Sequence, residues 1–186
     1  MKSTFYYLVT PLDGKEFSSM GKHGLILGAN IEDHRNTQRL AKVVGLPKSD
    51  DSGIQEGDVL LVHHNTFRTY YDMKGRARKS ANFVKDKLYY VEPERIYMHI
   101  RGNQENVFGS YSFVKPVQRE TEGFQFSTRA EKELVGEVAL IDDRFSKEEN
   151  VVVGDVVTFT KDSEYEFRIN DEKYYRVPTK NIVAVL

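Results

Sequence analysis

Short apolar stretches separated by Gly, Pro, Asn and Asp recur along the whole chain. Residues 165–169 (Tyr-Glu-Phe-Arg-Ile) alternate apolar and polar side chains, the pattern of a strand with one buried face. Residues 151–159 are rich in β-branched side chains and contain a Gly-Asp dipeptide that suits a turn before a strand. Helical periodicity is weak, and only residues 128–134 predict a short turn of helix. Many short strands with frequent turns predict an all-β chain, built as a barrel or a sandwich.

Five short motifs occur twice, each time in the same order. The partners are residues 6–12 and 111–117, 24–27 and 123–126, 40–44 and 135–139, 54–60 and 151–157, and 89–93 and 174–178. They lie 105, 99, 95, 97 and 85 residues apart, so each change of spacing marks an insertion or deletion in a loop. We therefore predict two tandem copies of one unit, residues 1–101 and 102–186, joined in the polar stretch at 101–105. A unit of this size with short strands suits a small Greek-key barrel.

The order of these motifs resembles that of a subunit of the GroES-type co-chaperonin family. Such a subunit has an opening strand, a long loop with Gly and an apolar triplet, a Gly-Glu-Val strand, a Val-Gly-Asp-Val-Val turn and strand, a hairpin, and a last strand centred on Ile. The second copy carries these features at residues 122–127, 135–139, 153–157 and 180–186. The resemblance covers most of the chain, and it implies two tandem GroES-like Greek-key β-barrels.

The resemblance also implies a partner, a GroEL-type chaperonin, and a means of contact. In the family, the apolar triplet of the loop docks in an extended form into an apolar groove of the chaperonin ring. In the first copy the triplet position holds Leu25, Ile26 and Leu27 between two glycines, and in the second it holds Phe124 and Phe126 around a Gln. Large apolar side chains on a Gly-flanked loop suit binding by an ordering segment. The alternative is that both triplets are buried core strands.

Family members form rings by pairing the first strand of one barrel with the last strand of the next. The resemblance therefore implies a homo-oligomer whose contacts involve Tyr6 and Leu8 at one end of the chain and Ile182, Val183 and Val185 at the other. Unpaired edges of this kind need a partner strand. Two barrels per chain do not tile a sevenfold ring, so we expect six or eight barrels, or one barrel unused.

Two features depart from the bacterial family. The intervals at 45–52 and 142–150 are too short and polar for the hairpin that roofs the family's dome, as in some bacteriophage co-chaperonins. The alternative function is accordingly a bacteriophage structural or decoration protein on the same barrel, with no chaperonin partner. The second departure is an insertion within residues 62–83 that carries Lys74, Arg76, Arg78 and Lys79 after two tyrosines, a composition that can meet phosphates and bases. The net charge of −1 gives no supporting field, so we expect a solvated hairpin tip and no nucleic-acid partner, and a nucleic-acid-binding β-barrel that uses the insertion is the third alternative.

Composition excludes several kinds of chemistry. The absence of cysteine excludes disulfides, thiolate metal sites and thiol catalysis. His63 and His64 are adjacent, and neighbours in a strand point to opposite faces, so they are not expected to share a metal ion. Asp142 and Asp143 are expected in a polar loop. We find no catalytic motif and predict a non-enzyme without cofactor or metal. No apolar run approaches the roughly 20 residues that cross a bilayer, which predicts a cytoplasmic protein, or a virion protein if the chain comes from a bacteriophage.

Overall fold

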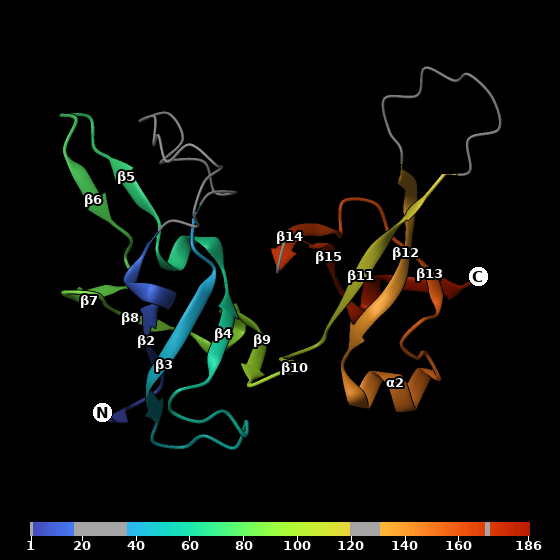
Figure 1. Ribbon diagram of the computed structural model, residues 1–186, viewed down its shortest axis with the longest axis horizontal. Helices are drawn as coiled ribbons and strands as arrows, with labels where there is room; N and C mark the ends of the chain where they lie inside the picture. The colour runs from blue at the N-terminus through green and yellow to red at the C-terminus, as the bar shows by residue number, and fades with distance from the viewer. Residues whose placement is uncertain (1, 17–36, 120–130, 170–171) are drawn as a thin grey trace. The chain divides into compact units, whose positions relative to one another are not determined.

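The computed structural model describes residues 2–16, 37–119, 131–169 and 172–186 (Figure 1). The chain divides into two compact units, Met1–Glu105 (unit 1) and Asn106–Leu186 (unit 2), whereas the sequence placed the boundary between residues 101 and 102. Strands dominate both units, and the described residues contain one α-helix, α2 (Asp143–Glu149). The prediction of an all-β chain is confirmed.

Unit 1 is built on one large sheet and one small one. The large sheet has the order β10-β9-β4-β3-β2-β8-β7, and β1 adds to β3 in parallel. β5 and β6 form a separate two-stranded sheet. The strands are β1 (Lys2–Ser3), β2 (Tyr7–Pro11), β3 (Leu40–Pro47), β4 (Val59–Val62), β5 (Thr69–Tyr71), β6 (Ala77–Lys79), β7 (Phe83–Lys85), β8 (Leu88–Val91), β9 (Ile96–Arg101) and β10 (Gln104–Val107). The last of these, β10, begins in unit 1 and ends two residues past the boundary.

The described residues of unit 2 form a six-stranded sheet with the order β14-β15-β11-β12-β13-β16. Its strands are β11 (Tyr111–Gln118), β12 (Glu131–Ile141), β13 (Val156–Phe159), β14 (Tyr165–Ile169), β15 (Glu172–Pro178) and β16 (Ile182–Val185). Helix α2 lies between β12 and β13, and the side chain of Asp142 caps it by accepting from the N–H groups of Arg144 and Phe145. The expectations of a helical turn at 128–134 and of a loop at Asp142 are therefore wrong where they can be assessed, because residues 131–134 belong to β12 and Asp142 is a helix cap.

The two sheets share one topology. Read from one edge, β7-β8-β2-β3-β4-β9 of unit 1 corresponds to β14-β15-β11-β12-β13-β16 of unit 2. The register agrees as well, since Val9 faces Val43 in unit 1 and Val114 faces Val138 in unit 2. In both units a register irregularity falls immediately before that pair, between Leu8 and Val9 and between Phe113 and Val114. Strand positions, and not only motifs, therefore recur between the units.

The recurring Gly-Asp dipeptide forms the same turn in each unit. Gly57 and Gly154 have φ angles of 98° and 96°, a region that disfavours side chains. The N–H of Gly57 donates to the Val43 carbonyl at 2.9 Å, and the N–H of Gly154 donates to the Val138 carbonyl at 2.8 Å. Each aspartate then accepts, through its own side chain, from the backbone N–H three residues earlier. The turn is thus closed by its own residues before β4 and β13 begin.

One motif alignment from the sequence is wrong by one residue. The sequence matched Tyr89 with Tyr174, but Tyr89 faces Val9 and its counterpart facing Val114 is Tyr175. Both segments contain a Tyr-Tyr doublet, so an alignment shifted by one residue pairs more identical residues. That slide would turn every side chain to the opposite face of the sheet. With the structural register, the spacing of this pair is 86 residues, the same as that between Ile96 and Ile182.

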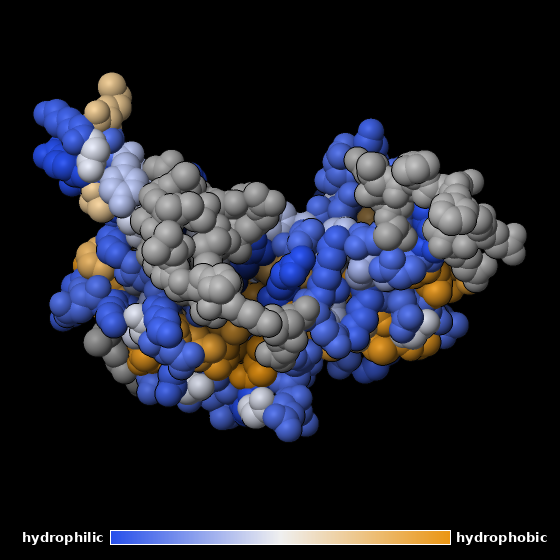
Figure 2. All heavy atoms as spheres, turned by 45° about the horizontal axis from the view of Figure 1, so that its top comes forward, coloured by the Kyte–Doolittle hydropathy of each residue, from blue (hydrophilic) through white to orange (hydrophobic). Residues whose placement is uncertain are grey.

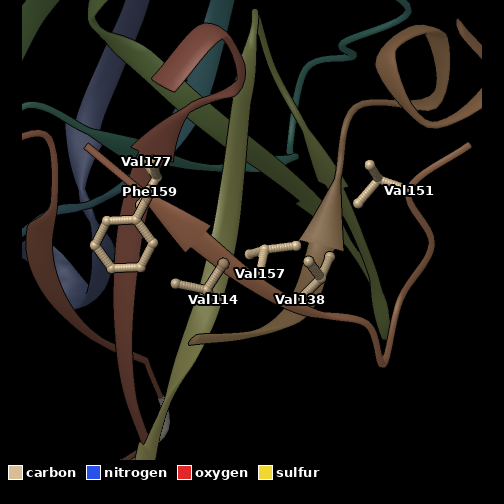
Figure 3. Packing of buried hydrophobic residues seen from close by; sticks show 6 residues of the cluster. All are labelled: Val114, Val138, Val151, Val157, Phe159 and Val177. Carbon is tan, nitrogen blue, oxygen red and sulfur yellow. The ribbon is translucent and has the colours of Figure 1, made fainter. Parts of the chain in front are cut away.

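The cores of the units occupy equivalent positions. Six buried side chains form one core cluster of unit 2: Val114, Val138, Val151, Val157, Phe159 and Val177 (Figure 3). Their counterparts by topology and register are also buried apolar residues, namely Val9, Val43, Ile54, Leu60, Val62 and Val91. The same six positions therefore supply apolar burial, the main stabilising contribution, in both units.

Among the described strands, neither sheet is closed by a pairing between its two ends. The expected closure of each unit into a barrel is not seen in this part of the chain. The strand that carries the first repeated motif is also internal in each unit, because β2 lies between β3 and β8 and β11 lies between β12 and β15. The expectation that the first strand offers an open edge is therefore wrong for β2: its backbone already pairs on both sides.

Candidate functional site

The two apolar triplets fall in equivalent connections of the shared topology. The first connection, residues 15–39, joins β2 and η1 (Leu12–Gly14) to β3, and the second, residues 119–130, joins β11 to β12. Leu25, Ile26 and Leu27 belong to the first and Phe124 and Phe126 to the second, and all five lie outside the described residues. What the structure describes is the base of each connection.

The ends of each connection are held together by the backbone. In unit 1 the N–H of Gln38 donates to the carbonyl of Glu16 at 2.9 Å. The side-chain oxygen of Gln38 then accepts from the N–H groups of Arg39 and Leu40, at 3.0 and 3.1 Å, which directs the chain into β3. In unit 2 Gln118 and Glu131 are opposite one another in the pairing of β11 with β12. Each connection therefore leaves the sheet and returns to it at neighbouring points.

A glutamate, a tyrosine and a lysine meet at the base of the first connection. The Tyr89 hydroxyl donates to Oε1 of Glu16 at 2.6 Å, and Lys79 forms an ion pair with the same carboxylate. The Tyr89 ring is fully buried, edge-on to Phe67 and Phe83 at centroid distances of 4.9 and 5.4 Å. Burial, with a smaller contribution from the neighbouring Glu16 carboxylate, raises the pKa of Tyr89. The hydroxyl therefore stays protonated and remains a donor.

The same three residue types meet at the base of the second connection. The Tyr175 hydroxyl donates to Oε2 of Glu131 at 2.7 Å, and Lys173 donates to both carboxylate oxygens at 2.9 and 3.0 Å. The Lys173 ammonium also lies over the Tyr175 ring, 4.7 Å from its centroid. Burial opposes the negative charge of Glu131, but hydrogen bonds from Tyr175 and Lys173 outweigh it and lower the pKa of the carboxyl group. We call these two groups, Glu16-Lys79-Tyr89 and Glu131-Lys173-Tyr175, the base clusters.

In the two base clusters only the tyrosine occupies equivalent positions of the two sheets; the glutamate and the lysine do not. Tyr89 and Tyr175 occupy equivalent places in the sheet. Glu16 lies at the start of its connection, whereas Glu131 follows its own as the first residue of β12. Each carboxylate accepts from a hydroxyl and pairs with an ammonium, so the clusters suit holding a backbone in place and contain no activated nucleophile. Sequence reasoning missed them because the glutamates are not equivalent between copies; only the repeated Tyr doublet pointed to the site.

The predicted contact residues near the two ends of the chain differ in whether their strand lies inside a sheet or at its edge. Tyr6 precedes β2 and its ring lies 5.0 Å from that of Tyr90, while Leu8 is half-buried within the internal strand β2. β16 lies at the edge of its sheet, with β13 as its neighbour among the described strands. Ile182 packs partly against the core, whereas Val183 and Val185 are exposed. Of the predicted contact residues, those of β16 therefore lie on an edge.

The paired histidines lie in a 3-10 turn, not in a strand. His63 caps η3 (His64–Thr66), its Nδ1 accepting from the N–H of Asn65, and the two imidazole rings stack at 4.1 Å. The premise that they point to opposite faces of a strand is therefore wrong. Within the part of the chain that the structure describes, no three His, Asp or Glu side chains are grouped as metal ligands. No helix formed by these residues is long and apolar enough to span a bilayer.

The predicted basic residues lie on the β5–β6 hairpin. Arg76 and Arg78 each donate through Nε to Oδ2 of Asp72, at 3.0 and 3.2 Å, and Lys79 is the member of the first base cluster. Lys74 lies exposed in the turn between the strands. The hairpin therefore contains two arginines fixed on one carboxylate, one exposed lysine and one lysine engaged elsewhere.

Comparison of the chain with protein-family models and with curated proteins found no match in either case. What the chain does must therefore be inferred from its own residues and their arrangement.

Proposed function

We propose that the chain is a co-chaperonin-like protein, built from two GroES-like units, that assembles into a ring and binds a GroEL-type chaperonin through its first and second connections. The observation that carries the proposal is the equivalence of these connections. Two apolar triplets that are unrelated in detail fall at the same place in a duplicated topology. In both units a base cluster lies where the connection meets the sheet.

The base clusters suit a segment that is tethered at both ends and docks in between. An apolar segment that becomes ordered on docking loses conformational entropy, so one connection binds weakly by itself. Several connections presented together on a ring gain affinity through multivalency. Fixed ends limit the volume that the segment samples, which lowers the entropy cost of docking.

Assembly is proposed to use β16. Among the described strands its outer edge pairs with none, so it offers backbone donors and acceptors to a strand of a neighbouring chain, and its exposed Val183 and Val185 add apolar contact. Replacing Val183 with proline removes one backbone donor from the strand. Light scattering is expected to show an oligomer for the unmodified chain and a shift toward the monomer for Val183→Pro. A monomeric unmodified chain at tens of micromolar, the range in which exposed strand edges associate, would refute this mode of assembly.

The chaperonin contact is tested with Ile26→Ser. The change removes about 2 kcal/mol of apolar burial at each docked connection, a loss repeated in every chain of a ring. We expect chaperonin binding, measured by surface plasmon resonance on an immobilised GroEL-type ring, to collapse while the melting temperature stays within a few degrees of the parent. Val84→Ser is the matched control, because Val84 is an apolar residue of β7 that is 49% exposed and lies outside both connections.

Two outcomes would contradict the proposal. A drop of many degrees in the melting temperature of Ile26→Ser would show that Ile26 is a core residue and not a docking residue. Absence of chaperonin binding by the unmodified chain, with its oligomer intact, would favour the alternative role as a structural or decoration protein.

A further inference from the structure

The β5–β6 hairpin, with its flanking residues 68–80, is present in unit 1 only. Unit 2 passes from β13 to β14 through residues 160–164 and still forms the equivalent sheet. The hairpin pairs only within itself among the described strands and rises away from the large sheet (Figure 1). In Figure 2 it projects from the upper left with a mainly hydrophilic surface and a few apolar atoms. Since the sheet forms without such a hairpin in unit 2, the hairpin is available for another role.

One face of the hairpin combines an aromatic ring with two guanidinium groups. Tyr70 lies directly opposite Arg78 in the pairing of β5 with β6, so their side chains share a face. Arg76 and Asp72 each lie two residues further toward the turn, and their ion pair at 3.0 Å places them on that face as well. Tyr70 is 43% exposed, and the side chains of Arg76 and Arg78 are 60% and 50% exposed.

Asp72 orders this face through both of its carboxylate oxygens. Its Oδ1 accepts from the N–H groups of Lys74 and Arg76, at 2.9 and 3.0 Å, which fixes the turn. Its Oδ2 accepts from Nε of both arginines, which holds the two guanidinium groups beside each other. Among the described residues, the terminal Nη groups of Arg76 and Arg78 have no partner, and these are the donors that bind phosphate oxygens in pairs.

The charge of the hairpin is opposite in sign to that of the chain. Residues 68–80 contain five basic residues and one acidic residue, whereas the whole chain has a net charge of −1. Lys79 is engaged by Glu16, so Lys74, Arg76 and Arg78 are the cations presented at the tip. An exposed aromatic face next to such cations suits stacked, unpaired bases with their phosphates. A bilayer surface could also contact the cations and the ring, so binding to anionic vesicles is measured as a separate outcome of the test.

We propose that the β5–β6 hairpin binds single-stranded nucleic acid, with Tyr70 stacking on a base and Lys74, Arg76 and Arg78 contacting phosphates. The sequence alone led to the opposite expectation, because the net charge offers no long-range attraction. The structure adds the shared face and the paired guanidinium groups, which act at short range. Binding is accordingly weak and sensitive to salt. It is independent of the chaperonin contact, which involves other residues.

Fluorescence anisotropy with a labelled oligothymidine of roughly 15 nucleotides, long enough for one site, tests the proposal. The full-length chain is expected to bind at about 50 mM salt and to lose most of its affinity by about 200 mM. Arg76→Gln/Arg78→Gln should weaken binding at least tenfold and reduce the slope of log affinity against log salt by about 1.4, the loss of two phosphate contacts. Tyr70→Ser should weaken binding about tenfold, whereas Tyr70→Phe, which keeps the ring, should not.

Lys161→Gln/Arg168→Gln in unit 2 is the matched control, because it removes the same charge from exposed positions. It should leave binding within twofold of the parent. If the arginine pair proves necessary for folding, as judged by circular dichroism, Lys74→Glu at the exposed turn replaces it and should weaken binding at least as strongly. No binding at about 50 mM salt, equal losses in the control, or binding confined to duplex DNA or to anionic phosphatidylserine vesicles would each overturn the proposal.

Discussion

Replacing Tyr89 with phenylalanine tests whether the first base cluster stabilises unit 1. The change removes one hydroxyl and keeps the ring, so the edge-on contacts with Phe67 and Phe83 remain and no cavity forms. What is lost is the 2.6 Å hydrogen bond to Glu16. The Glu16 side chain is only 14% exposed, so water replaces the lost donor poorly.

The magnitude follows from the character of that bond. A hydrogen bond to a charged group contributes about 1.5–3 kcal/mol, and Lys79, 41% exposed, compensates little. We therefore expect Tyr89→Phe to lower the free energy of unfolding of unit 1 by about 2 kcal/mol. Tyr175→Phe is the matched change in unit 2. There Glu131 is 29% exposed and keeps both contacts with Lys173, so the cost should be about 0.5–1 kcal/mol.

Hydrogen exchange followed by mass spectrometry, at increasing urea concentrations, separates the two units because peptides report on each one. The expected result is faster exchange in β2, β3 and β8 for Tyr89→Phe, with unit 2 unchanged. Equal costs for the two substitutions, or a cost below about 0.5 kcal/mol for Tyr89→Phe, would show that the carboxylate does not depend on the buried hydroxyl.

Three further predictions follow from other contacts. Asp58→Asn should destabilise unit 1 more than Asp155→Asn destabilises unit 2 in urea unfolding, because Asp58 also accepts hydrogen bonds from Arg101 at 2.8 and 2.7 Å. The Arg101 hydrogen bonds, together with that from the Gln55 N–H, lower the pKa of Asp58. The stability that Asp58 contributes is therefore present above about pH 4 and is lost as the pH falls below it. Gly136→Ala should lower the free energy of unfolding by about 1–3 kcal/mol, measured by thermal unfolding, because the new Cβ would lie 2.6 Å from Cγ2 of Val114. An unchanged melting temperature would show that β11 moves aside without loss of stability. Burial raises the pKa of Tyr7 to about 12, so the stability that its hydroxyl contributes is complete below about pH 10 and is lost as the pH rises from there toward 12. Tyr7→Phe should flatten the plot of unfolding free energy against pH in this range. An unaltered plot would contradict the prediction.

Much of the strand arrangement was open to prediction because it depends on local patterns. Alternation and β-branched runs indicated the strands, and the Gly-Asp dipeptides indicated turns whose glycines do adopt positive φ angles. The Tyr doublet misled because residue identity outweighed the side-chain period of two, which only the pairing of β8 and β15 with their neighbours resolves. Helix α2 was missed because seven residues are too few for a clear helical period, and its best signal was the capping Asp142.

The base clusters were beyond sequence reasoning for a different reason. Glu16 and Tyr89 are 73 residues apart, and Glu131 and Tyr175 are 44 apart, so no local pattern joins them. Their carboxylates also enter from opposite ends of the equivalent connections. Only the three-dimensional register shows that one tyrosine position serves both. The paired arginines of the hairpin were missed although Asp72 is close to them in sequence, because the basic residues were read as a charge run without considering this carboxylate.

The neck of the β5–β6 hairpin has a consequence for protein engineering. Ser80 donates from its hydroxyl to the Thr66 carbonyl at 2.7 Å, so the chain leaves and re-enters unit 1 at adjoining points. Phe67, which packs on Tyr89, lies on the sheet side of that neck. Residues 69–79 can thus be excised and replaced by a short Gly-containing bridge without removing a buried apolar side chain, at the loss of the buried Thr69 and of the Lys79–Glu16 pair. The same neck is a natural insertion point, where an affinity tag or a foreign binding loop can be grafted onto the chain while both of its ends stay untouched.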